Sequence, residues 1–84
     1  MVEVSESLVN DYISREIITK PELLPLNNGT KLLESGIIDS LSLLKLVLFL
    51  EQKFGVVVGA EELVPENFQT VSTICTFLRT KNKS

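Results

Sequence analysis

The segment from Leu41 to Leu50 constrains the fold of this chain more than any other. Only Ser42 and Lys45 within it are not apolar, and this far exceeds the stripe of roughly 100° that a surface helix needs to cover a core. Asp39 or Ser40 can start a helix here, because either side-chain oxygen can accept a hydrogen bond from a first-turn amide. The helix should run to about Lys53, and Phe54-Gly55 should close it. The segment therefore predicts a central helix of a small bundle, with one apolar side left over for transient contacts.

Two further main helices are predicted from apolar residues that recur every three to five positions. The first covers about 4–18, and the last follows Thr70, which can cap it. A short fourth helical piece is predicted within 60–68, interrupted by Pro65, and the basic tail should fray from about residue 80. The expected fold is all-α, a small bundle of four helices, three main and one short. The residues that set the spacing are Val4, Leu8, Val9, Tyr12, Ile13, Ile17 and Ile18, and then Val71, Ile74, Phe77 and Leu78.

A long connection should join the first two helices, from about Lys20 to Asp39. Pro21 and Pro25 stop a helix, and the Asn-Asn-Gly sequence at 27–29 favours a turn. Loops longer than about 15 residues are uncommon unless they are functional or pinned to the fold. We therefore expect apolar anchors to hold it across the bundle, namely Leu23, Leu24, Leu26, Leu32, Leu33, Ile37 and Ile38. The Val56-Val57-Val58 run after the central helix should be a buried connection rather than a strand.

Composition excludes several classes of function. The 84 residues suffice for one domain, 1–84, and a net charge of -3 is the wrong sign for a nucleic-acid partner. Without His, and with Cys75 as the single cysteine, neither a zinc site nor a Ser-His or Cys-His nucleophile can be assembled. We therefore expect no metal site and no enzyme. The sequence shows no signal peptide and no apolar run of about 20 residues, so we expect a cytoplasmic protein without membrane contact.

Ser40 stands where an outward-facing hydroxyl is chemically useful. A Gly-containing approach, Glu34 to Asp39, delivers it to the first turn of the most apolar helix. Free amides and the positive end of the helix dipole at that place favour a phosphodiester over a neutral group. Asp39 can cap the helix, and its carboxylate can also contact a metal ion brought by a modifying enzyme. Both roles are open from the sequence.

The chain resembles the acyl and peptidyl carrier protein family at Asp39-Ser40-Leu41, which is similar to that family's Asp-Ser-Leu attachment motif. The resemblance implies that a phosphopantetheinyl transferase moves 4'-phosphopantetheine from coenzyme A onto Ser40. An adenylating or other acyl-loading enzyme would then charge the thiol as a thioester, and downstream synthase or transferase domains would use it. The carrier itself would catalyse nothing. The resemblance continues in register through 43–50, 51–56, 62–63, 65–70 and 74–78.

Two departures from the commonest family pattern narrow this interpretation. A glycine usually stands three residues before the serine, but here that residue is Ile37 and the glycine is Gly36. This arrangement is similar to D-alanyl carriers and other discrete carriers of aminoacyl units. The second helix also lacks the acidic lining of fatty acid carriers, since it offers Lys45 and only Glu51 near its end. These features favour a peptidyl-type carrier or a specialised acyl carrier of polyketide, nonribosomal peptide or related secondary metabolism.

Partner docking is predicted on the central helix beside the serine, through apolar contact. The candidate docking residues are Leu41, Leu43, Leu46 and Val47, with Lys45 setting polarity. Two alternatives to a carrier remain. The first is an unmodified helical interaction module that keeps the carrier fold, and the second is a small lipid-binding helical protein. Nothing in the sequence indicates a stable oligomer, so we expect a monomer.

The remaining reactive or charged residues are assigned structural roles. Cys75 lies four residues after Val71 on the last helix, where a buried, inert thiol is expected. The phenylalanines should fill the core rather than form a ligand cage. The local acidic cluster should be solvated surface. The phenylalanines are Phe49, Phe54, Phe68 and Phe77, and the cluster comprises Glu61, Glu62 and Glu66.

Overall fold

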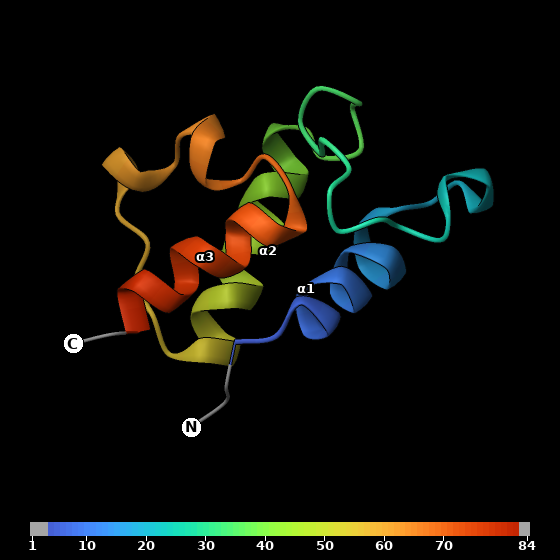
Figure 1. The fold of residues 1–84 in the computed structure, drawn as a ribbon. Coiled ribbons are helices and arrows are strands. Elements are labelled where there is room, and N and C mark those ends of the chain that lie inside the picture. The colour runs from blue at the N-terminus through green and yellow to red at the C-terminus, as the bar shows by residue number, and fades with distance from the viewer. Residues whose placement is uncertain (1–3, 83–84) are drawn as a thin grey trace.

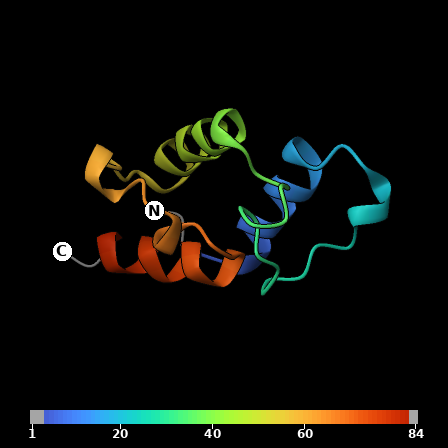
Figure 2. The same ribbon diagram turned by 90° about the horizontal axis from the view of Figure 1, so that it is seen from above.

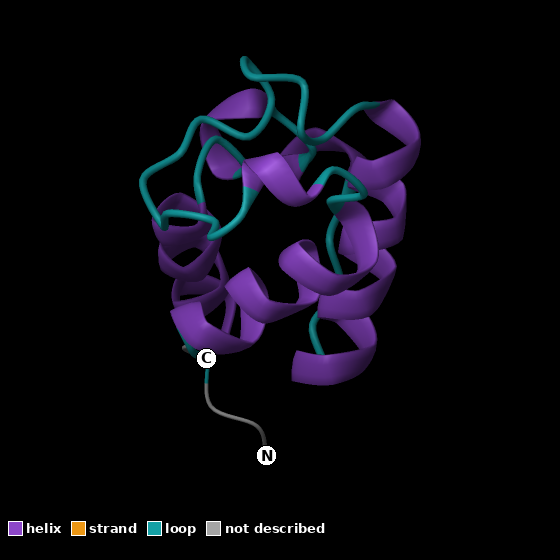
Figure 3. Ribbon diagram, turned by 90° about the vertical axis from the view of Figure 1, so that its right-hand side faces the viewer, coloured by secondary structure: helices purple, strands orange, loops and turns teal. Residues whose placement is uncertain are grey.

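Three α-helices make up most of the regular structure in the part of the chain that the structure describes. The computed structural model describes residues 4–82 and contains α1 (Glu6–Tyr12), α2 (Ser40–Phe54) and α3 (Val71–Asn82) (Figure 1). The first of them continues as a π-helical turn, η1 (Ile13–Ile17). Figure 3 shows helices joined by loops, with no strand anywhere in the described residues. The prediction of an all-α fold is confirmed.

The helix ends follow from local chemistry that the sequence indicated. Thr70 Oγ1 accepts a hydrogen bond from the Thr73 amide at 3.0 Å at the start of α3. Gly55 ends α2 with φ 67°, a left-handed conformation that glycine adopts without a steric penalty. The third helix reaches Asn82, past the position near residue 80 where we expected fraying. Lys83 lies outside the described residues.

One apolar core joins all three helices to the long connection. The Tyr12 ring of α1 stacks on Phe49 of α2 with ring centroids 3.8 Å apart, and Ser72 of α3 donates a hydrogen bond to Glu6 of α1 at 2.8 Å. Cys75 is buried, as predicted. No helix in the described part is long and apolar enough to cross a membrane. The buried residues include Val9, Ile13, Leu26, Leu32, Ile38, Leu46, Leu50, Phe54, Phe68, Ile74 and Leu78.

Hydrogen bonds and buried leucines pin the long connection between α1 and α2. The Asn10 amide group donates to the Leu26 carbonyl and to Asn28 Oδ1, both at 2.7 Å. Farther along, the Leu32 amide donates to the Gln69 carbonyl at 2.8 Å, just before α3. The segment from 26 to 38 therefore lies against α1 and the amino end of α3, and so the residues before α2 occupy a fixed position.

The first part of this connection differs from the prediction. Leu23 and Leu24 are exposed rather than anchored, because they lie at the short 3₁₀ turn η2 (Pro21–Leu23). In Figures 1 and 2 this turn lies at one end of the molecule, and the carboxyl end of α3 lies at the other. Two of the seven predicted anchors are therefore wrong.

The segment between α2 and α3 also differs in part from the prediction. A short fourth helix is not confirmed, since the structure has two separate 3₁₀ turns, η3 (Ala60–Glu62) and η4 (Pro65–Asn67), each of three residues. Pro65 begins the second turn, which suits a residue without an amide hydrogen. Val56 is buried, but Val57 is exposed, so the valine run is a buried connection only in part.

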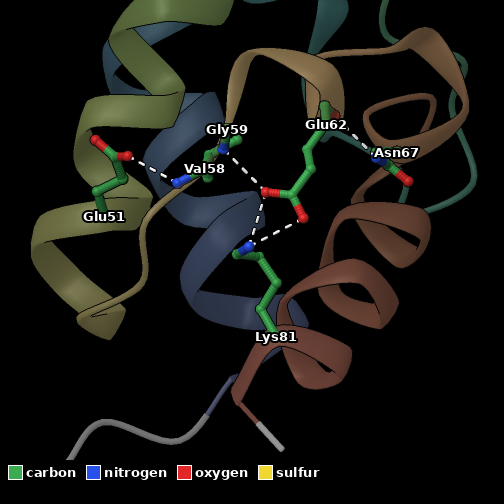
Figure 4. Close-up of polar contacts among 6 residues, drawn as sticks. All are labelled: Glu51, Val58, Gly59, Glu62, Asn67 and Lys81. Carbon is green, nitrogen blue, oxygen red and sulfur yellow. Dashed lines mark hydrogen bonds and ion pairs between the residues drawn. The ribbon is translucent and has the colours of Figure 1, made fainter. Parts of the chain in front are cut away.

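A polar cluster fastens this segment to both neighbouring helices (Figure 4). The Glu62 carboxylate accepts hydrogen bonds from Lys81 Nζ of α3 at 2.7 and 3.0 Å and from the Gly59 amide at 2.9 Å. Glu51 of α2 accepts from the Val58 amide at 2.9 Å. Glu62 is therefore a partly buried structural residue, and its assignment to solvated surface is wrong.

The Glu62 carboxylate should make stability depend on pH. The Lys81 ammonium, and then the Gly59 amide, hold the pKa of Glu62 below its ordinary value. A carboxyl group whose pKa falls on folding stabilises the fold above its unfolded pKa, about 4.3, and this contribution disappears as the pH falls through the lower folded value.

We therefore expect Glu62→Gln to reduce the urea midpoint at neutral pH and to flatten its dependence on pH below about 5. Urea titrations followed by circular dichroism between neutral and acidic pH measure both effects. Glu61→Gln is the matched control, because Glu61 is exposed on the same turn. Equal behaviour of the two variants would show that the pair contributes nothing specific.

Candidate functional site

Ser40 is the first residue of α2, and it is exposed. Two residues earlier, Ile38 is buried, and its amide donates a hydrogen bond to the Leu32 carbonyl at 3.1 Å. The chain is thus anchored in the core immediately before it emerges at Asp39 and Ser40. This arrangement fixes the backbone at the serine and leaves its side chain at the surface.

Asp39 is the residue that caps α2. Its Oδ1 accepts a hydrogen bond from the Ser42 amide at 2.9 Å, so the cap, for which the sequence left two candidates, does not use the Ser40 hydroxyl. The hydrogen bond from the Ser42 amide is the main reason that the pKa of Asp39 lies below its ordinary value. The carboxylate is therefore charged at neutral pH and lies beside the serine at the surface. A contact of Asp39 with a metal ion stays a prediction.

The displaced glycine has a structural role in the approach to Ser40. Gly36 has φ 80°, a conformation that residues with a Cβ rarely adopt. Its amide donates to the Leu33 carbonyl at 3.2 Å, which closes a turn just before Ile37 and Ile38 enter the fold. The glycine at this position is therefore required by the turn that delivers the serine.

The Ser40 hydroxyl can act as a nucleophile, but another protein must supply the base that activates it. The hydroxyl lies at the amino end of the 15-residue α2, where free amides and the helix dipole favour an attached phosphate group. The chain has no histidine to act as a base. Cys75 offers no alternative nucleophile, because burial raises the pKa of its thiol. Among residues 4–82, no group of three or more potential ligands is arranged to hold a metal ion.

An apolar face begins directly beside Ser40. Leu41, Leu44 and Leu48 keep 78%, 52% and 58% of their surfaces exposed. Their spacing of three and four residues puts them on one side of α2. We call these three residues the leucine face. It begins at the residue after the serine, and exposed apolar surface of this kind is typical of sites of protein interaction.

The predicted docking residues do not all lie at the surface of α2. Leu41 lies on the leucine face, but Leu46 and Val47 are 0% and 6% exposed and belong to the core. Their assignment to the docking surface is wrong, because they lie on the side of α2 that packs inward. Leu43 is half-buried against the same core. Lys45 is exposed, and its Nζ donates to the Glu16 carbonyl at the end of η1 at 3.1 Å.

Leu44 and Leu48 were missed by the sequence interpretation. The signal that could have found them is the step of three and then four residues from Leu41, the apolar residue next to the serine. Because α2 is apolar on nearly all sides, this pattern competes with an equally regular one that begins at Leu43.

Comparison with known protein families agrees with this geometry. A sequence model described as phosphopantetheine attachment site matches residues 15–78 of the chain. The chain therefore belongs to the phosphopantetheine-attachment family of acyl and peptidyl carrier proteins. No curated protein matches it significantly.

Members of this family carry 4'-phosphopantetheine covalently on a serine and interact with phosphopantetheinyl transferases and synthase enzymes. When bound, the group supplies a thiol that holds intermediates as thioesters. The residues of this chain fit such a group. Ser40 is exposed at the amino end of α2, and the helix cap is supplied by the neighbouring Asp39, which accepts the hydrogen bond from the Ser42 amide in place of the Ser40 hydroxyl.

Proposed function

We propose that Ser40 carries the phosphopantetheine arm and that the chain is a single-domain shuttle, not an enzyme, for acyl or aminoacyl thioesters. The observation that carries this proposal is the exposed Ser40 in the first turn of α2, held between the buried Ile38 and the core side of the helix. This serine also lies inside the matched region, residues 15–78. Tethering an intermediate here replaces free diffusion with a high effective concentration at each partner.

Attachment of the arm requires only a simple exchange at phosphorus. Ser40 Oγ forms a bond to the phosphorus that bears the pantetheine of coenzyme A, and the bond from that phosphorus to the nucleotide half breaks. The proton of the hydroxyl goes to a base of the transferase, since this chain has no histidine to accept it. The charged Asp39 beside the serine can contact the metal ion that the transferase brings.

The cargo we propose is an aminoacyl or specialised acyl group of polyketide, nonribosomal peptide or related secondary metabolism. The outward side of α2 near Ser40 presents leucines and Lys45 rather than carboxylates. An adenylating or other loading enzyme and the downstream synthase domains would therefore recognise this carrier through apolar contact more than through charge. We propose that the shuttle acts as a monomer in the cytoplasm.

Intact-protein mass spectrometry tests the proposal. The chain is incubated with a broad-specificity phosphopantetheinyl transferase and coenzyme A, and we expect the mass to increase by one arm. Ser40→Ala should abolish the increase completely. Ser42→Ala is the matched control, because Ser42 lies in the same helical turn and its side chain should not be needed. An unmodified wild-type chain would instead favour the interaction module, for which the leucine face would be the binding surface.

A further inference from the structure

Among the asparagines of the sequence, only Asn28 stands directly before a glycine, Gly29. An asparagine side chain can lose ammonia when the main-chain nitrogen of the next residue attacks its Cγ atom. Glycine obstructs this attack least, because it has no Cβ. The pair is therefore a candidate site of spontaneous modification, and the reaction would need neither a partner protein nor an arm at Ser40.

The surroundings of this pair leave it open to water. Asn27 and Gly29 are exposed, and Asn28 is half-buried. The Gly29 amide donates a hydrogen bond to Asn27 Oδ1 at 2.7 Å. Because both partners are exposed, this hydrogen bond can open at low cost. Base in the solvent can then remove the amide proton and leave the Gly29 nitrogen free to attack.

A hydrogen-bond donor already lies where negative charge would develop in the reaction. Asn10 Nδ2 donates to Asn28 Oδ1 at 2.7 Å. Attack at Cγ puts negative charge on this oxygen, and a donor that is fixed beforehand stabilises such a charge. Asn10 is itself held in place, because its Nδ2 also donates to the Leu26 carbonyl at 2.7 Å and its Oδ1 accepts from the Ser14 hydroxyl at 3.1 Å. The folded chain therefore assists the first step.

We propose that Asn28 converts spontaneously to aspartate and isoaspartate in the folded chain. The Gly29 nitrogen forms a bond to Cγ of Asn28, the bond from Cγ to the side-chain nitrogen breaks, and ammonia leaves with the proton of the Gly29 amide. Water then opens the resulting cyclic imide. Attack of water at Cγ gives aspartate, whereas attack at the main-chain carbonyl gives isoaspartate. Neither step needs an oxidant or a reductant.

The two products differ in their effect on the fold. Asn28 lies in a turn in which the Thr30 amide donates to the Asn27 carbonyl at 3.1 Å, and the Asn28 carbonyl accepts from the Ser72 amide at the start of α3 at 3.2 Å. Aspartate keeps this main chain, and its charge strengthens the hydrogen bond from Asn10. Isoaspartate adds a carbon atom to the main chain inside the turn. It therefore loosens the connection between α1 and α2.

Peptide mapping after long incubation at mildly alkaline pH tests the proposal. Trypsin releases residues 16–31 as one peptide, because the bond before Pro21 resists cleavage, and this peptide contains both Asn27 and Asn28. Tandem mass spectrometry should place the new acid at Asn28 and leave Asn27 intact. Equal conversion of the two asparagines would overturn the inference. So would a chain that converts in urea but not in native buffer, because the fold would then protect the site.

Gly29→Ala is the matched variant for the rate. Gly29 is not among the glycines with positive φ, and an added Cβ would lie 3.3 Å from Oδ1 of the exposed Asn27 side chain, which can shift to make room. The fold should therefore be kept. Conversion should slow by about tenfold or more, because the Cβ hinders the approach of the main-chain nitrogen. An unchanged rate would contradict attack by this nitrogen.

Urea unfolding of the converted chains tests the structural consequence. Anion-exchange chromatography isolates these chains, and an isoaspartyl methyltransferase measures their isoaspartate content. The urea midpoint should fall as this content rises. Asn28→Asp, the matched control for the aspartate product, should stay near the wild type. Equal midpoints for the isoaspartate chains and Asn28→Asp would contradict the loosened connection. The chains carry no arm, so neither result depends on the proposed function.

Discussion

Replacing Leu46 with alanine should lower the free energy of unfolding by about 2–5 kcal/mol. Leu46 is 0% exposed, so its truncation removes buried methyl groups and leaves a cavity in the core. The total stability of a small domain is about 5–15 kcal/mol, and the loss is therefore a large part of it. Urea unfolding followed by circular dichroism at 25 °C measures the difference.

Leu48→Ala is the matched control for this loss. It makes the same chemical change in the same helix, but Leu48 is 58% exposed. The expected change in unfolding free energy is within about 0.5 kcal/mol, as for most surface substitutions. Similar losses for the two variants would contradict the assignment of one leucine to the core and the other to the leucine face.

Leu44→Asp should reduce kcat/KM for arm attachment by tenfold or more, equivalent to about 1.4 kcal/mol or more. The substitution puts a carboxylate in the middle of the leucine face, where central apolar residues of an interface contribute most of the binding energy. Initial rates with a phosphopantetheinyl transferase and coenzyme A, followed by intact mass, give the comparison with the wild-type chain.

A lower attachment rate for Leu44→Asp reports weaker docking only if the substitution leaves the stability of the fold unchanged. Leu44 is 52% exposed, so we expect an unaltered helical circular dichroism spectrum. Gln52→Asp adds the same charge to an exposed position near the other end of α2 and should leave the rate near that of the wild type. A Leu44→Asp variant that is modified at the wild-type rate would remove the leucine face from the recognition surface.

The limits of α2 could be predicted because local chemistry sets them. The side chain of Asp39 satisfies an amide of the first turn, and Gly55 adopts the left-handed conformation that ends the helix. Neither feature depends on distant parts of the chain. For the same reason the exposed position of Ser40 followed from its place immediately after a cap.

The orientation of α2 could not be predicted from its apolar pattern. Leu41, Leu44 and Leu48 repeat at helical spacing, and so do Leu43, Leu46 and Leu50, so the sequence contains two regular stripes. Tertiary packing of α1 and α3 decides which one is buried. The docking prediction mixed the two stripes and therefore placed two core residues at the surface.

The role of Glu62 also depended on information that is not local. Its partner Lys81 is 19 residues away in sequence, and only the path of the chain through η3 and η4 brings them together. A cavity near the amino end of α2 has the same origin, because its walls come from two stretches of the chain, one within residues 17–23 and the other at residues 35–37. Pairings of this kind become visible only in the folded chain.

The most direct test of the central claim is to locate the arm on the modified chain. Trypsin cleaves after Lys31 and Lys45, so residues 32–45 form one peptide that contains Ser35, Ser40 and Ser42. Fragmentation of this peptide by tandem mass spectrometry should place the whole added mass on Ser40. An arm found on either of the other serines, or a peptide that stays unmodified after treatment with an active transferase and coenzyme A, would contradict the account.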